Sequence, residues 1–328
     1  MEDLLAGLRA AAEATRLRLL MLCAESELTV GELTLILGQS QPRVSRHLKL
    51  LCDAGLLDRL REGTRVFYRV GRAGGRGGDL ARRLLSLVPQ NDPTALLDRE
   101  RLDAIRAQRE EAATAYFRAN AARWDRIRSL YVDELEVEAA LLSLIPPHEV
   151  HDLLDIGTGT GRMLEVLASR VETAVGVDLS REMLAVARVN LERAKLRNCS
   201  IRQGDMYQLP VAGAAVDAVI FHQVLHYAEN PLGAIAEAAR VLRPGGRLVI
   251  VDFAPHTIEF LRDEHAHRRL GFADAEITGW ASECGLEPAP VLHLPGNPLT
   301  VSLWLARAKG GRPSRGAPAL RAAEGAGA

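Results

Sequence analysis

The sequence predicts a mixed α/β protein with two unlike parts joined by a helical connector. Residues 1–70 have the spacing of short amphipathic helices followed by a β-hairpin. From residue 151 onward, short apolar strands alternate with helices, a pattern typical of a doubly wound parallel sheet. Five glycines fall within residues 71–78, where we expect a flexible hinge.

Composition divides the chain into four segments. We expect a first domain over residues 1–72, a glycine hinge and helical connector over 73–145, a second domain over 146–308 and a disordered tail over 309–328. A long helix of the connector should begin at Pro93 and Thr94. The tail has almost no large apolar residue, so it cannot bury a core.

Cysteine usage and hydropathy indicate a cytoplasmic protein. The four cysteines are far apart in the sequence and form no CxxC motif, as expected of reduced thiols. The first ten residues carry two acids and no basic segment, so we expect no signal peptide. Because no apolar run approaches about 18 residues, no membrane span is expected.

A helix-turn-helix is predicted inside the first domain. Thr29 is a plausible N-cap for the first helix, and Glu32, three residues later, would complete a capping box. That helix should end at Gly38, and a second should begin after Ser40 with Pro42 in its first turn. In the second helix, Val44, Leu48 and Leu51 lie on one face and should pack inward.

The remaining side chains of the second helix point to DNA binding. They include Gln41, Arg43, Ser45, Arg46, His47 and Lys49, residue types that contact base edges and phosphates. Residues 39–72 hold eight Lys or Arg against three Asp or Glu, although the whole chain has a net charge of -1. We add Arg61 and Arg65 of the hairpin to the predicted surface. The alternative is the solvated basic face of a protein-interaction module.

These segments resemble the ArsR-type winged-helix repressors. The resemblance covers residues 8–70 and is carried by residues 13–20, by residues 40–48 and by the hairpin at 61–68. It implies a homodimer that pairs through terminal helices and binds a palindromic double-stranded DNA operator. Metal-sensing members carry E-L-C-V-C-D-L, where this chain has Thr29 and Gly31 in place of both cysteines. We therefore expect no metal in this domain.

A glycine-rich turn follows the first strand of the second domain. Residues 151–156 form an apolar strand, and glycines follow at 157, 159 and 161. A dinucleotide-binding fingerprint needs its third glycine one residue later, where this chain has Arg162. Asp155 stands two residues before the first glycine. A second strand ends in Asp178, 21 residues beyond Gly157, where an acid can accept bonds from ribose hydroxyls.

The D-x-G-x-G-x-G pattern resembles motif I of class I S-adenosylmethionine-dependent methyltransferases. The resemblance covers roughly residues 115–308 and implies a seven-stranded doubly wound sheet that binds S-adenosylmethionine. It leans toward the ubiquinone/menaquinone-type and arsenite-type enzymes for small molecules. The implied cofactor contacts come from Asp155, Gly157, Thr158, Gly159, Gly161, Asp178, Leu179, Asp205, Met206 and His222. Asp205 would take the adenine amino group, and Met206 would offer its backbone.

Several histidines follow the fourth and fifth strands, where ligands of such sheets bind. His222 and His226 are four residues apart, and we name both as candidate catalytic residues. They could supply a general base for the methyl acceptor, or chelate a metal if they share a helical turn. A third alternative is that His222 lines the cofactor and the other histidines make ordinary hydrogen bonds.

The sequence limits the chemical class of the methyl acceptor only by excluding some classes. Residues 221–224 read Phe-His-Gln-Val and not N-P-P-Y, so a nucleobase acceptor is not expected. The scattered cysteines do not provide the clustered thiols that arsenite methylation needs. We therefore predict a transcription regulator fused to a methyltransferase for small molecules. The alternative is a sensor in which bound S-adenosylmethionine or S-adenosylhomocysteine controls operator binding without turnover.

Overall fold

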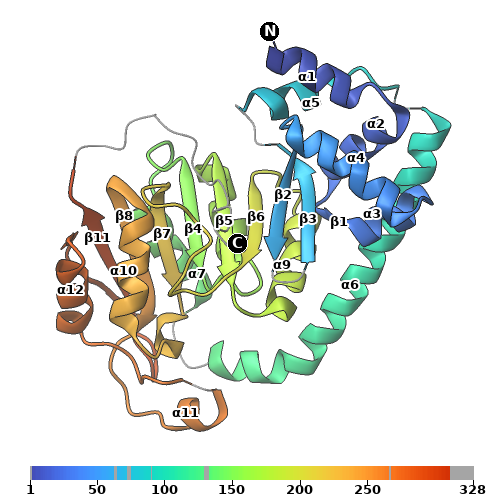
Figure 1. Ribbon diagram of the computed structural model, residues 1–328. Helices are drawn as coiled ribbons and strands as arrows, with labels where there is room; N and C mark the ends of the chain where they lie inside the picture. Colours follow the sequence, from blue (N-terminus) through green and yellow to red (C-terminus); the bar gives the residue numbers. More distant parts are fainter. Residues whose placement is uncertain are drawn as a thin grey trace. The chain divides into compact units, whose positions relative to one another are not determined.

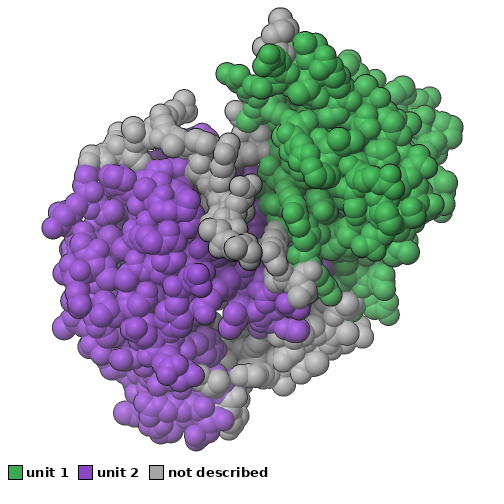
Figure 2. Space-filling model, in the orientation of Figure 1, with its two compact units in different colours: residues 1–112 green, residues 113–328 purple. Residues whose placement is uncertain are grey.

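The computed structural model describes residues 2–62, 65–71, 75–89, 91–128, 133–265 and 267–310 (Figure 1). The chain forms two compact units, residues 1–112 and residues 113–328 (Figure 2). The side chain of Arg61, the hairpin turn and the tail beyond residue 310 lie outside the described residues. None of the described helices is long and apolar enough to cross a membrane.

Unit 1 contains helices packed around a small sheet. Its elements are α1 (Glu2–Ala11), α2 (Ala14–Glu25), β1 (Leu28–Thr29), α3 (Val30–Leu37), α4 (Gln41–Asp53), β2 (Leu57–Glu62), β3 (Arg65–Val70), α5 (Arg76–Leu85) and the first part of α6 (Pro93–Arg128). The predicted hairpin is present, with β2 and β3 paired from Leu57↔Val70 to Glu62↔Arg65. β1 adds a third strand on the other side of β3.

Helices α3 and α4 form the predicted helix-turn-helix. The Thr29 backbone N–H donates to Glu32 Oε2 at 2.7 Å, and the Glu32 N–H donates to Thr29 Oγ1 at 3.3 Å. This capping box confirms the predicted start of α3. Gly38 ends α3 with a φ of 64°, in the left-handed region that glycine adopts without steric cost. Val44, Leu48 and Leu51 are buried in the core of unit 1, as predicted.

The expected glycine hinge is wrong for its second half. Helix α5 begins at Arg76, inside the glycine-rich segment, while residues 72–74 lie outside the described residues. A Cβ on Gly77 would lie 2.1 Å from the backbone oxygen of Gly55. Glycine there permits a backbone approach that any side chain would prevent. These glycines thus pack α5 against the turn before β2.

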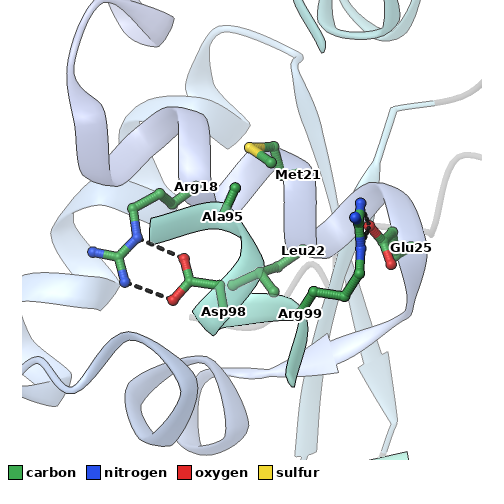
Figure 3. A pocket seen from close by; sticks show the side chains of 7 residues that line it. All are labelled: Arg18, Met21, Leu22, Glu25, Ala95, Asp98 and Arg99. Atoms are coloured by element: carbon green, nitrogen blue, oxygen red, sulfur yellow. Dashed lines mark hydrogen bonds and ion pairs between the residues drawn. The ribbon is translucent and has the colours of Figure 1, made fainter. Parts of the chain in front are cut away.

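The first part of α6 is held in unit 1 by arginine side chains. Arg18 of α2 donates two bonds to Asp98 of α6, at 2.6 and 2.7 Å (Figure 3). Arg99 of α6 reaches back to Glu25 of α2 at 2.7 Å, on the other side of the shallow hollow in that figure. The structure therefore divides the chain within α6, at residue 112, and not at the expected residues 72 and 145.

Arg109 connects α6 to the helix-turn-helix. Its guanidinium donates to Glu32 Oε1 at 2.7 and 3.0 Å and to the Glu27 carbonyl at 3.0 Å. Burial opposes ionisation of Glu32, but the Arg109 charge and the Thr29 bonds outweigh it and hold the pKa of Glu32 below its ordinary value. The carboxylate that caps α3 therefore also binds α6.

Unit 2 is a sheet covered by helices on both faces. Beyond α6, its helices are α7 (Glu134–Leu144), α8 (Arg162–Leu167), α9 (Arg181–Arg193), α10 (Pro231–Val241), α11 (Phe260–His265) and α12 (Asp274–Glu283), with short 3₁₀ segments η1 (Ala168–Arg170) and η2 (Leu225–Tyr227). Its strands are β4 (Asp152–Ile156), β5 (Thr173–Asp178), β6 (Cys199–Gln203), β7 (Val216–His222), β8 (Leu242–Phe253), β9 (Leu286–Pro288), β10 (Leu292–Leu294) and β11 (Val301–Ala308). In Figure 1 the strands β8, β7, β4, β5 and β6 follow one another from left to right in the order of the sheet.

The sheet order creates the place for a site. The strands run β10-β11-β8-β7-β4-β5-β6, and the central pairs from β8 to β6 are parallel. The described sheet has eight strands and not the expected seven, because the short β9 also pairs with β11. Strand β4 lies between β5 and β7, so the chain order reverses there. Ligands of doubly wound sheets bind at the carboxyl ends of the strands beside such a reversal.

Both faces of β4 are buried, which explains its continuous apolar sequence. Leu153 packs on one face with Leu141 of α7 and Leu164 of α8. Leu154 packs on the other face with Ala238 of α10 and Ile277 of α12. The strand therefore cannot shift without moving both layers, and its carboxyl end is firmly positioned.

We predict that Asp98→Ala destabilises unit 1. The Asp98 side chain is 4% exposed, and its loss leaves the mostly buried Arg18 without its two carboxylate bonds, a change worth about 3 kcal/mol. Hydrogen–deuterium exchange of the full chain should show α2 and the start of α6 exchanging faster. Arg76→Ala is the control, because its ion pair with Asp3 is exposed on both sides and should add nothing measurable. Equal protection of α2 and α6 from exchange in both variants would contradict a stabilising role for the Arg18–Asp98 contact.

Candidate functional site

The turn after β4 needs glycine at three positions. Gly157, Gly159 and Gly161 have φ angles of 71°, 53° and 81°, which L side chains rarely adopt. A Cβ on Gly157 would also lie 2.3 Å from Val224 Cγ2. The backbone N–H groups of Gly157 and Thr158 both donate to the Val177 carbonyl, at 2.7 and 3.0 Å. The turn is therefore attached to the end of the neighbouring strand β5.

Asp155, near the end of β4, is a buried carboxylate with one oxygen available. It is 1% exposed, and its Oδ2 accepts the hydroxyl of Thr158 at 2.6 Å. Its Oδ1 is buried and has no partner among the described residues. Burial raises the pKa of Asp155 to about 7; the Thr158 bond opposes this effect, and the nearby Asp178 charge adds to it. The residue is thus suited to meet a cationic donor.

Asp178 ends β5 and faces the glycine turn. Its Oδ2 accepts the Gly159 N–H and its Oδ1 accepts the Ser180 N–H, both at 2.8 Å. Burial raises the pKa of Asp178, and these backbone bonds partly offset that effect. The next residue, Leu179, is 69% exposed. A carboxylate with fixed orientation therefore stands beside an uncovered apolar side chain.

Asp205 and Met206, which follow β6, are less firmly held than Asp155 and Asp178. Asp205 is exposed, and its Oδ1 accepts the Tyr207 N–H at 3.0 Å, so it also caps its own turn. Met206 is partly buried against the core on the α10 side of the sheet. Their contacts with an adenine base stay predictions.

His222 and His226 do not share a helix. His222 ends β7, Gln223 follows with a φ of 51°, and His226 lies in η2. The i, i+4 helical spacing that would suit chelation is absent, and the described residues contain no group of three or more His, Cys, Asp or Glu that could hold a metal. His222 Nε2 is buried and has no partner among the residues that the structure describes. Burial lowers the pKa of His222 to about 4, against the charges of Asp252 and Glu138.

His226 is paired with an acid that sequence reasoning missed. Its Nδ1 lies 2.7 Å from Asp252 Oδ1 in β8, and both side chains are buried. The ring of His267, a residue also not assigned a role, stacks on His226 with centroids 3.9 Å apart. Asp252 ends the apolar run at residues 248–251, the same signal that marked Asp155 and Asp178. No local signal marks His267, because its contact with His226 is long-range.

The predicted DNA-binding residues lie on one helix and the hairpin of unit 1. Of the predicted set, the residues exposed on α4 and β3 are Gln41, Arg43, Ser45, Arg46, Lys49 and Arg65. Lys49 makes an exposed ion pair with Asp53 at 2.8 Å. His47 is turned inward, with its Nδ1 3.7 Å from the Glu13 carboxylate. The structure thus separates His47 from the otherwise solvent-facing set.

Comparison with known proteins identifies both units. Residues 154–250 match the family model of a methyltransferase domain, and residues 13–59 match that of a bacterial regulatory protein of the arsR family. A demethylmenaquinone methyltransferase of Deinococcus radiodurans is 34% identical, over 56% of this chain and 79% of the relative. A malonyl-(acyl-carrier protein) O-methyltransferase of a Marinomonas species is 31% identical, over 42% of this chain and 53% of the relative. The YcgJ protein of Bacillus subtilis, a solved structure, superposes with a TM-score of 0.48 at 19% identity, over 54% of this chain and all of that chain.

The chain therefore belongs to the methyltransferase family, and an arsR-family regulatory domain precedes its methyltransferase domain. Both resemblances stated from the sequence are confirmed. The chain spans between 37% and 53% of the length of several other curated relatives that it matches.

We predict that Gly157→Ala lowers the free energy of unfolding of unit 2 by roughly 1–3 kcal/mol, because it combines a left-handed φ with a steric clash. Gly279→Ala in α12 is the matched control, since its Cβ would meet nothing within 4 Å. That change should stabilise unit 2 by up to about 1 kcal/mol. Urea unfolding followed by tryptophan fluorescence measures the free energy of unfolding of both variants. A Gly157→Ala variant as stable as the wild type would show that the turn does not require glycine.

Proposed function

We propose that unit 2 binds S-adenosylmethionine at the carboxyl ends of β4 and β5 and methylates a small molecule. The observation that carries this proposal is the pair of carboxylates, Asp155 and Asp178, on either side of the glycine turn. The bonds from Gly159 to Asp178 and from Thr158 to Asp155 orient both side chains toward that turn. Relatives named as methyltransferases support the enzymatic alternative over the sensor alternative.

The residues present suit this cofactor better than a dinucleotide. S-adenosylmethionine has no phosphate, and it carries a cationic sulfonium and an ammonium group, which carboxylates attract. Arg162 stands where a dinucleotide fingerprint needs glycine, and it is already bound by Glu138 at 2.6 and 2.9 Å. No arginine is therefore left free at this position to bind a pyrophosphate.

Each residue of the site has a proposed role. Asp178 accepts the ribose hydroxyls, and Leu179 supplies an apolar surface for the adenine, with Asp205 and Met206 at its polar edge. The turn at Gly157, Thr158, Gly159 and Gly161 allows close approach of the amino-acid part, whose ammonium group interacts with Asp155. His222, at the end of β7, would lie between the cofactor and the acceptor. When bound, the cofactor supplies an electrophilic methyl group.

We predict that Asp178→Ala weakens binding of S-adenosylmethionine at least tenfold. The reason is the loss of charge-assisted hydrogen bonds, worth roughly 1.5–3 kcal/mol each. Isothermal titration calorimetry of the full chain measures the effect. Glu172→Ala is the control, because Glu172 is an exposed acid at the opposite end of the same strand. Equal affinity in the wild type and Asp178→Ala would refute the assignment of the cofactor site.

We infer that unit 1 binds a double-stranded DNA operator with α4 in the major groove. The exposed polar and cationic side chains of α4 support this, together with the basic hairpin and the arsR-family match. Arg61 and Arg65 would contact phosphates, which fix the position of the protein on the duplex. A homodimer would then place two α4 helices about one helical turn of DNA apart.

We predict that Arg46→Ala weakens operator binding by about 1–3 kcal/mol and relaxes base preference at one position. Arg83→Ala in α5 is the control, because Arg83 is exposed but lies outside the α4 surface. The operator is first selected from a random DNA pool with the wild-type protein, and affinities are then measured by gel shift. Identical affinity and base preference in Arg46→Ala would exclude this residue from the interface.

A further inference from the structure

A buried His–Asp pair lies next to the proposed cofactor site. His226 is 2% exposed and Asp252 is 0% exposed. Strands β7 and β8 are paired up to His222↔Val251, so Asp252 stands one residue beyond the partner of His222. The pair therefore lies at the carboxyl ends of the strands, as the proposed cofactor site does, and an acceptor molecule must enter at this end of the sheet.

The bonds around Asp252 fix the position of the proton on His226. Its Oδ2 accepts the His226 backbone N–H at 3.1 Å, and its Oδ1 accepts the Phe253 N–H at 2.9 Å. Oδ1 also meets His226 Nδ1 at 2.7 Å. Because a carboxylate can only accept, Nδ1 carries the proton and Nε2 keeps a lone pair. His226 is thereby held as a base with its reactive atom facing away from Asp252.

That reactive nitrogen has no partner within the described part of the chain. His226 Nε2 is buried and makes no hydrogen bond there. Buried polar atoms in native proteins are almost always satisfied. The unmet lone pair thus indicates a ligand that brings its own hydrogen-bond donor.

The ring of His226 is surrounded by other aromatic rings. The ring of His267 stacks on it, Tyr227 lies at 4.2 Å between centroids, and Phe253 lies at 5.7 Å. Burial lowers the pKa of His267 to about 3, and burial also lowers the pKa of His256. These imidazoles are neutral near pH 7. Aromatic rings of this kind pack well against the flat face of an aromatic molecule, and the Nε2 lone pair calls for a donor, which a carboxylate does not supply.

We propose that the methyl acceptor is an aromatic hydroxyl compound whose hydroxyl group donates to His226 Nε2. This inference rests on the proposed methyl transfer. The O–H bond of the acceptor breaks and its proton moves to Nε2. The oxygen lone pair forms the bond to the methyl carbon, and the electrons of the broken carbon–sulfur bond stay on the sulfur of S-adenosylhomocysteine. Asp252 is a positioning residue, since it acts through His226.

Binding of three matched probes tests the acceptor class without relying on turnover or on variants. The probes are 2-naphthol, 2-methoxynaphthalene and 2-naphthoate, which share one ring system and differ in the polar group. In the presence of S-adenosylhomocysteine, the wild-type chain should bind 2-naphthol at least about tenfold tighter than either of the others, because a site built for a hydroxyl donor rejects analogues that lack it. Absence of 2-naphthol binding, or equal binding of the three, would overturn the proposal.

Variants then locate the effect. His226→Gln should weaken 2-naphthol binding at least about tenfold and abolish its methylation, while binding of S-adenosylhomocysteine stays unchanged. Asp252→Asn should bind 2-naphthol less tightly, because an amide nitrogen opposite Nδ1 moves the proton to Nε2. His151→Gln is the control, since His151 also pairs with a carboxylate but precedes β4 at the opposite edge of the sheet.

The outcomes separate this inference from the proposed function. Wild-type protein that fails to bind S-adenosylhomocysteine contradicts the cofactor site itself. Intact cofactor binding with 2-naphthol affinity unchanged in His226→Gln contradicts only the role of His226. Melting temperatures show whether a variant still folds. If a variant does not fold, the comparison of the three probes on the wild-type protein decides whether the acceptor is an aromatic hydroxyl compound.

Discussion

The attachment of the glycine turn to β5 is the constraint on which the site depends. Two backbone bonds to the Val177 carbonyl and one from Gly159 to Asp178 join the loop after β4 to the end of the next strand. They are possible only because the turn adopts backbone angles that favour glycine. As a result, two carboxylates from different strands lie beside one another. The burial of both faces of β4 then prevents the arrangement from shifting.

In unit 1, one carboxylate joins two elements. Glu32 caps α3 with one oxygen and binds Arg109 of α6 with the other. The first helix of the helix-turn-helix and the long helix α6 therefore share one buried carboxylate. Any change that moves α6 relative to α3 must break this contact. The position of the helix-turn-helix relative to α6 therefore depends on two residues that are 77 positions apart in the chain.

The elements that the sequence could predict are those fixed by local patterns. Short-range spacing predicts the capping box at Thr29 and Glu32, the inward face of α4, and the two strands that carry Asp155 and Asp178. The same reasoning failed at Gly77, because the glycine-rich composition of residues 71–78 suggested flexibility. Its actual role, close packing against Gly55, depends on a contact that no local pattern reveals. Strand β9 was missed because it is short and depends on pairing with β11.

The candidate site was predictable to the same extent. Acids at strand ends and glycines at the turn were visible in the sequence, and His226 was named there. Its partner Asp252 lies 26 residues away and its stacking partner His267 lies 41 residues away, so the arrangement that makes His226 a base required the fold. The helical spacing assumed for His222 and His226 failed because the chain turns sharply at Gln223.

The central claim is that buried carboxylates at the ends of β4 and β5 hold S-adenosylmethionine or its product. Calorimetric titration of the full chain with S-adenosylhomocysteine at pH 6 and pH 8 tests it most directly. The pKa of Asp155 is about 7, so its carboxylate form, which attracts the ligand's ammonium group, predominates only at the higher pH. The account predicts binding at both values and tighter binding at pH 8, by at most about tenfold per pH unit below the pKa. No binding at either pH, or weaker binding at pH 8, would contradict it.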